Sequence, residues 1–137
     1  MFKHVVVGAS ESAGGERAVQ RALALVQASG GTLHVVSALA AREGPVPQVP
    51  EEFRYTDAGA GSADWVLSQA RAQAGKAEVQ ITTHPVLAEP AAAIAKVAAE
   101  LGADLIVVGC GQDHGDRHLS GVDRAVLDGA GCAVLVV

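Results

Sequence analysis

Short β-branched runs alternate along this chain with segments of helical periodicity, and this alternation restricts the fold more than any other feature. Four largely apolar runs lie at residues 4–7, 32–37, 104–109 and 133–137. Such runs predict strands covered on both faces, as in a parallel sheet. Residues 78–83 alternate polar and apolar side chains and predict a fifth strand at an edge of the sheet.

Helical patterns fill the intervals between these runs. Four helices are expected, over residues 16–28, 60–74, 89–101 and 122–127. Pro90 favours the first turn of the third helix, and Gly102 ends that helix. In the second helix, Trp65, Val66 and Ala70 form the apolar stripe that is expected to face the core. Because aromatic residues make up only 3% of the chain, the core must be built from Val, Leu, Ile and Ala.

The element order is therefore strand and helix in alternation, beginning and ending on a strand. Right-handed crossovers between parallel strands then produce one doubly wound α/β domain over residues 1–137, with a five-stranded, mostly parallel sheet and helices on both faces. The proline-bearing stretch 40–57 is interpreted as a surface excursion after the second strand, and not as a domain boundary.

The charge balance argues against two classes of partner. Fifteen acidic and ten basic residues give a net charge of −5, without a cluster of Lys and Arg, so neither nucleic-acid nor membrane-surface binding is expected. No apolar stretch reaches the roughly 20 residues of a membrane helix. Residues 1–4 lack a signal-peptide pattern, and Cys110 and Cys132 form no disulfide framework or zinc pattern. A cytoplasmic location is expected.

Two segments resemble the universal stress protein family. Residues 89–94 read Glu-Pro-Ala-Ala-Ala-Ile, and residues 102–109 read Gly-Ala-Asp-Leu-Ile-Val-Val-Gly. In that family an acid-Pro-Ala-x-x-Ile helix leads to a strand of this kind. Residues 32–36 and 126–137 are similar to the family's second strand and to its closing helix and strand. The resemblance extends over nearly the whole chain and is weakest through residues 40–76.

The resemblance implies the strand order 3-2-1-4-5, with strands numbered along the chain and the order reversing between the first and the fourth. Ligands of open α/β sheets bind at such a switch point, beyond the carboxyl ends of the strands. Many universal stress proteins bind ATP there, so ATP or AMP is the candidate cofactor. The candidate cofactor-binding residues are Ala9, Ser10, Val36, Gly109, Gly111, Ser120, Gly121 and Val122.

The phosphate loop of this chain departs from the family's pattern of Gly, two residues, Gly, nine residues and then Gly-Ser or Gly-Thr. Gln112 stands at the position of the second glycine, with Gly111 one residue early. The closing pair is reversed, as Ser120-Gly121, and the loop is two residues shorter. Ser120 is also placed to cap the helix that follows, and this use is favoured over phosphate contact.

Charge around the loop also opposes ATP. Asp113 and Asp116 lie where a polyphosphate would have to bind, and Arg117 offsets only one of them. The family often has a carboxylate after the first strand, near the adenine base, whereas residues 8–10 here read Gly-Ala-Ser. Weakened or lost ATP binding is therefore the working hypothesis.

Other chemistries fit the sequence less well. Asp113, His114, Asp116 and His118 could serve as metal ligands, but a glycine-bearing loop does not secure three or four converging ligands, and a surface loop is favoured. Residues 8–15 lack the Gly-Lys-Ser/Thr ending of a P-loop, so a turn into the first helix is favoured. For Cys110, a partly buried thiol is favoured over a redox role.

No set of nucleophile, base and orienting residue is visible, so no enzyme is predicted. His34 falls within a buried strand and is interpreted as a core histidine whose polar atoms have partners. The sequence thus predicts a non-catalytic, cytoplasmic stress-response or regulatory protein, and the resemblance implies a homodimer joined through the C-terminal strand. The alternative is an ATP- or AMP-binding family member with an atypical phosphate loop. A nucleotide enzyme domain of similar topology is disfavoured, because such chains are longer.

Overall fold

The computed structural model describes residues 2–10, 12–39, 58–113, 116–118 and 121–137. The expected excursion at 40–57 lies outside these residues, as does Ser120 with its expected capping role. Within them, a five-stranded sheet of parallel strands has the order β3-β2-β1-β4-β7. Its strands are β1 (His4–Gly8), β2 (Thr32–Leu39), β3 (Ile81–Leu87), β4 (Leu105–Val108) and β7 (Ala133–Val136). The predicted α/β architecture and strand order are confirmed.

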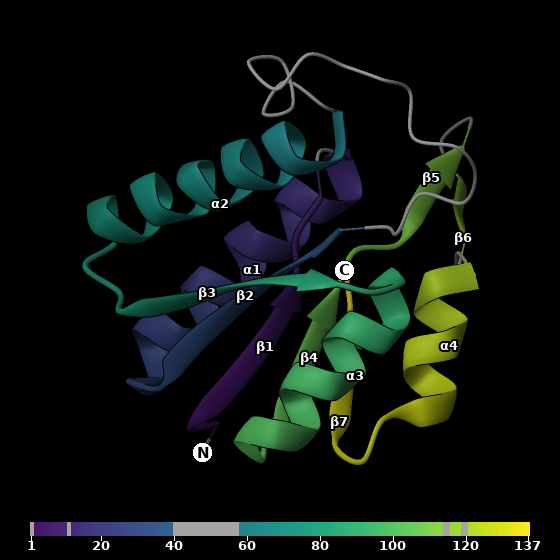
Figure 1. The fold of residues 1–137 in the computed structure, drawn as a ribbon. Helices are drawn as coiled ribbons and strands as arrows, with labels where there is room; N and C mark the ends of the chain where they lie inside the picture. The colour runs from purple at the N-terminus through teal and green to yellow at the C-terminus, as the bar shows by residue number, and fades with distance from the viewer. Residues whose placement is uncertain (1, 11, 40–57, 114–115, 119–120) are drawn as a thin grey trace.

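Two helices cover each face of the sheet (Figure 1). The helices α1 (Ala13–Ser29) and α2 (Ala58–Lys76) pack on one face, whereas α3 (Pro90–Leu101) and α4 (Gly121–Gly129) pack on the other. Alanines supply much of the helical surface in contact with the strands. Those buried on α1, α2 and α3 are Ala18, Ala22, Ala70, Ala74, Ala93 and Ala98. Small side chains let the helices approach the sheet closely, as the composition predicts.

The third strand begins later than predicted. Residues 78–83 were expected to form it, but β3 spans Ile81–Leu87. The residues before it complete the end of α2: the N–H groups of Ala77, Glu78 and Val79 donate to carbonyl groups within that helix, and Glu78 has a positive φ of 55°. These residues are therefore a helix ending and not a strand. The edge position is correct, and an edge strand tolerates Pro85 because one side of its backbone needs no donor.

The apolar stripe of α2 also differs from the prediction. Val66 and Ala70 are buried, together with Leu67 and Ala74, whereas Trp65 is 50% exposed. Residues four apart share a helix face, so the stripe runs through positions 66, 70 and 74. Trp65 lies about 100° around the helix from Val66 and falls at the edge of the stripe.

His34 has partners in the sheet on both sides, as expected of a core histidine. Its side chain is 6% exposed. Its Nδ1 atom lies 3.2 Å from Nε2 of His84 in β3, and its Nε2 atom lies 3.5 Å from Nδ1 of His4 in β1. Burial, and then the charges that His84 and His4 can carry, lower the pKa of His34 from its ordinary value.

This lowered pKa makes the stability of the fold depend on pH. The unfolded chain takes up the His34 proton near pH 6.5, whereas the folded chain takes it up only at lower pH. The unfolded state therefore binds more protons in that window, and the free energy of unfolding should fall as the pH is lowered below about 6.5. Urea unfolding of the wild type and of His34→Gln between about pH 8 and pH 5 measures this. A pH slope that the substitution leaves unchanged would contradict the prediction.

Candidate functional site

The candidate site lies at the switch point of the sheet, between β1 and β4. The strands on either side of this point are reached by crossovers in opposite directions, and ligands of open α/β sheets bind beyond the carboxyl ends of the strands at such a point. Ala9 and Ser10 follow β1 there, and Gly109 and Cys110 follow β4. The strand order thus places the candidate residues that follow β1 and β4 next to each other.

Gly109 is in close contact with the first turn of α1. A Cβ atom on Gly109 would overlap the carbonyl group of Gly14 and lie 2.8 Å from its Cα. A Cβ on Gly14 would in turn lie 2.9 Å from the carbonyl oxygen of Cys110. Two glycines therefore let the start of α1 rest on the end of β4. The structure gives Gly109 a packing role that needs no phosphate.

The N-terminus of α1 is capped by the chain itself. Ser12 is the N-cap, and its Oγ accepts a hydrogen bond of 3.0 Å from the N–H of Gly15. The Ser10 hydroxyl lies 2.7 Å from the Ser12 hydroxyl. The N–H of Glu16 donates to the Ser12 carbonyl at 3.0 Å. Ser10, a candidate cofactor-binding residue, therefore belongs to the capping network of α1.

Arg17 is a residue of this region that sequence reasoning missed. From α1 its Nη2 donates to the carbonyl oxygens of Cys110, at 3.0 Å, and Val137, at 3.4 Å, and lies 3.9 Å from Sγ of Cys110. Its Nε is buried without a hydrogen-bond partner in the described structure. Arg17 thereby ties α1 to the ends of β4 and β7. An arginine beside the apolar stripe of a helix is the only sequence signal for it.

The loop after β4 folds into a hairpin that the sequence analysis did not predict. The strands β5 (Gly111–Asp113) and β6 (Asp116–His118) pair in antiparallel fashion, with Gly111 opposite His118 and Asp113 opposite Asp116. Figure 1 shows this hairpin beyond the tip of β4, before α4 begins. In such a ladder, backbone N–H and C=O groups of the two strands bond to each other. The groups that face the partner strand are then engaged within the hairpin.

The remaining candidate residues divide between the backbone and the core. The N–H of Ala9 donates to the carbonyl of Val36 at 2.9 Å, which joins the ends of β1 and β2. The Val36 side chain is buried, and Val122 packs at the border of the same apolar cluster, on the α3 and α4 side. Gly121 is exposed and opens α4. The structure thus brings Ala9 and Val36 together, while Val36 and Val122 offer no polar side-chain group to a ligand.

Metal and thiol chemistry gain no support from the described part of the chain. No group of three or more His, Cys, Asp or Glu residues there could hold a metal ion. Cys110 is buried, Cys132 is half-buried, and both are free thiols. Burial, and then the nearby Asp104 carboxylate, raise the pKa of Cys132. In the same described ranges, no helix has the length and apolarity needed to cross a membrane.

Comparison with known proteins identifies the class of protein to which this fold belongs. The model of the universal stress protein family matches residues 1–137. The chain belongs to the universal stress protein family. A search of curated proteins found no match.

Solved structures agree with this assignment. A universal stress protein in complex with cAMP is 28% identical, with a TM-score of 0.73, covering 99% of this chain and 97% of that chain. A family member from Burkholderia pseudomallei is 24% identical, with a TM-score of 0.78 and coverage of 99% and 96%. A family protein from Arabidopsis thaliana with AMP bound is 18% identical, with a TM-score of 0.74 and coverage of 98% and 90%.

Proposed function

We propose that this universal stress protein is a single-domain, non-catalytic regulatory module of the cytoplasm whose binding of ATP is weakened or lost. The observation that carries the proposal is the β5–β6 hairpin, which occupies the place of the family's phosphate loop. A loop that cradles phosphates must present free backbone N–H groups to them. Pairing between β5 and β6 engages backbone groups of this segment with each other.

Charge supports the same proposal. Asp113 and Asp116 are opposite each other in the hairpin register, so two acidic residues stand together beside the switch point. At about 5 Å and an effective dielectric near 20, one carboxylate opposes one phosphate charge by about 3 kcal/mol before salt and solvent screen it. A triphosphate meets this repulsion more strongly than a monophosphate does.

The two helix N-termini beside the crevice are also less available to an anion. The first turn of α4 carries Asp123, whose side chain is 2% exposed. The first turn of α1 has the Ser12 cap and Glu16. Acidic side chains in a first turn already interact with the positive end of the helix dipole. Less of that favourable field remains for phosphate oxygens.

An adenosine nucleotide with fewer phosphates is the ligand class that the proposal retains. The relative solved in complex with cAMP supports an adenine nucleotide as the ligand class. Held there, it would contact mainly backbone groups near Ala9, Ser10, Gly109, Gly111 and Gly121, because Gly8-Ala9-Ser10 supplies no carboxylate for the base. The alternative is an ATP or AMP binder whose hairpin rearranges to present its N–H groups.

A homodimer through β7 completes the proposal. This strand is at the end of the sheet, and its Ala133 and Leu135 side chains are exposed. An uncovered apolar edge strand is a ready site for pairing with another strand. Pairing of two β7 strands would cover it in both copies.

Mass spectrometry of the small molecules released from the purified, unsupplemented protein tests the ligand part of this proposal. We expect no ATP, and either no nucleotide or a nucleotide with fewer phosphates. ATP released in an amount close to that of the protein would support the alternative.

A further inference from the structure

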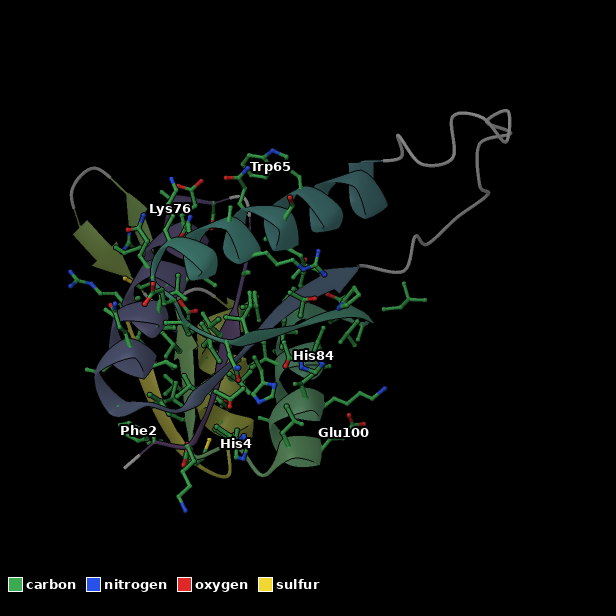
Figure 2. The ribbon with its side chains drawn as sticks, turned by 90° about the vertical axis from the view of Figure 1, so that its left-hand side faces the viewer. Phe2, His4, Trp65, Lys76, His84 and Glu100 are labelled. Atoms are coloured by element: carbon green, nitrogen blue, oxygen red, sulfur yellow. The ribbon has the colours of Figure 1, made fainter. Side chains whose placement is uncertain are left out.

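Three histidines form a continuous line across three neighbouring strands. We call His4 of β1, His34 of β2 and His84 of β3 the histidine row. Its nitrogen–nitrogen separations are 3.5 Å between His4 and His34 and 3.2 Å between His34 and His84. The ring centroids are 5.7 and 5.3 Å apart. Figure 2 labels the two ends, His4 and His84, which lie beside α3.

The two nitrogens of His34 serve different neighbours, and this determines how many protons the row can hold. Each of the two nitrogen–nitrogen contacts needs one proton between its atoms, because one nitrogen must donate and the other accept. Three neutral rings carry three protons. Two of these occupy the contacts, and the third lies on an outer nitrogen, either Nδ1 of His84 or Nε2 of His4. All three neutral rings must therefore have the same tautomer.

Added protons change this pattern in a defined way. A fourth proton fills the second outer nitrogen, and both contacts keep a donor and an acceptor. A fifth proton has no place except within a contact that already holds one, so two N–H groups would face each other there. The row thus accepts one extra proton with both nitrogen–nitrogen contacts intact, and it accepts a second only when one of these contacts breaks.

We propose that the histidine row is one proton-binding site shared by β1, β2 and β3, which takes up a single proton with both contacts intact and breaks a contact when it takes up a second. The extra charge resides on one of the two outer rings, His4 or His84. His4 is exposed and His84 half-exposed, whereas burial lowers the pKa of His34. Because β3 is an edge strand, a broken contact between His34 and His84 would remove a side-chain link that holds it to β2.

The helix α3, which packs on this face of the sheet, brings no buried ionisable side chain to the row. The buried residues of α3 are Ala93, Ile94, Val97 and Ala98, and none of them ionises. Lys96 and Glu100, on the same helix, are exposed. Near the end of the row, the Asp104 carboxylate accepts hydrogen bonds from the backbone N–H groups of Lys3, at 2.8 Å, and His4, at 3.2 Å.

A metal ion explains the geometry less well than protons do. The two nitrogens of His34 take part in separate contacts, so the three rings do not converge on one point. Among the described residues, no set of three possible ligands could hold a metal. A contact of 3.2 Å between two ring nitrogens is accounted for by one shared proton.

Long-range ¹H–¹⁵N spectra of the labelled full chain test the proposal, because they report the tautomer of each imidazole. We expect His4, His34 and His84 to share one tautomer at high pH, and the first added proton to make one of the two outer rings, His4 or His84, doubly protonated while both contacts persist. His84→Ala should change the tautomer ratio of His4, although β2 lies between them. His118→Ala, which removes a histidine of β6, should leave that ratio unchanged.

Two results would overturn the proposal: unrelated tautomers in the three rings, or a His4 ratio that is the same in the wild type and in His84→Ala. Backbone amide spectra of each variant report whether the fold is kept. If His84→Ala does not fold, His84→Gln removes the imidazole while keeping a polar side chain, and the same change at His4 is expected from it.

Discussion

Replacing Gly109 by alanine is expected to lower the free energy of unfolding by about 3 kcal/mol, the upper part of the range for overpacked sites. The added Cβ would overlap the carbonyl group of Gly14, and backbone atoms cannot turn aside as a flexible side chain can. The first turn of α1 would have to move away from β4. That movement would stretch the hydrogen bond from Arg17 to the Cys110 carbonyl.

Gly75→Ala is the matched control for this substitution. Gly75 lies within α2, and a Cβ there meets nothing within 4 Å. Alanine is favoured over glycine inside a helix by roughly 0.5–1 kcal/mol, so the control should be as stable as the wild type or slightly more stable. Urea unfolding of both variants gives the comparison. Equal stability of Gly109→Ala and Gly75→Ala would contradict the close contact between Gly109 and Gly14.

Deleting residues 134–137 is expected to yield monomeric or insoluble protein. Pairing of β7 with β4 covers one side of β4, and Val134 and Val136 pack against the apolar cluster under α3 and α4. Val137 exchanges backbone hydrogen bonds with Val108, at 2.9 Å, and Cys110, at 2.8 Å. Their loss would expose a new sheet edge and part of the core. Size-exclusion chromatography and the soluble yield report the outcome.

A point substitution separates loss of the dimer from loss of the fold. Leu135 is 37% exposed on the edge strand, so Leu135→Glu places a charge at the proposed interface with little cost to the core. We expect a folded monomer, because two such charges would meet across paired β7 strands. A dimer of unchanged elution volume in either variant would argue against assembly through β7.

Much of the fold could be predicted because its strands are buried on both faces. Apolar runs such as those of β1 and β4 identify such strands directly. Glycines and Pro90 locate helix ends, and Gly30 and Gly102 do end α1 and α3 in the left-handed conformation. The order of the strands came from the family resemblance, since periodicity carries no information about which strands are neighbours.

The errors arose where tertiary contacts overrode the local pattern. The positive φ of Glu78 extends the helix ending into the predicted start of β3. The hairpin of β5 and β6 has polar strands of three residues each, too short for a recognisable alternation. The contact of Arg17 with Cys110 joins residues 93 positions apart, and no spacing rule links them.

The glycine at position 109 illustrates the limit most clearly. The family resemblance assigns Gly109 to a phosphate loop, whereas the structure requires a glycine there because Gly14 approaches so closely. Packing against Gly14 is therefore sufficient reason for a glycine at this position, with or without a phosphate. The position of the candidate site is predictable from topology, but its capacity for a triphosphate depends on the backbone path after Gly109.

Isothermal titration of the purified protein with ATP, and in parallel with AMP, tests the central claim most directly. Because the hairpin engages its own backbone groups and carries two acidic residues, the dissociation constant for ATP should lie well above the micromolar range. The substitution of both Asp113 and Asp116 by Asn should lower it, whereas Asp128→Asn, in the last turn of α4, should not. A micromolar or tighter dissociation constant for ATP in the wild type would contradict the account.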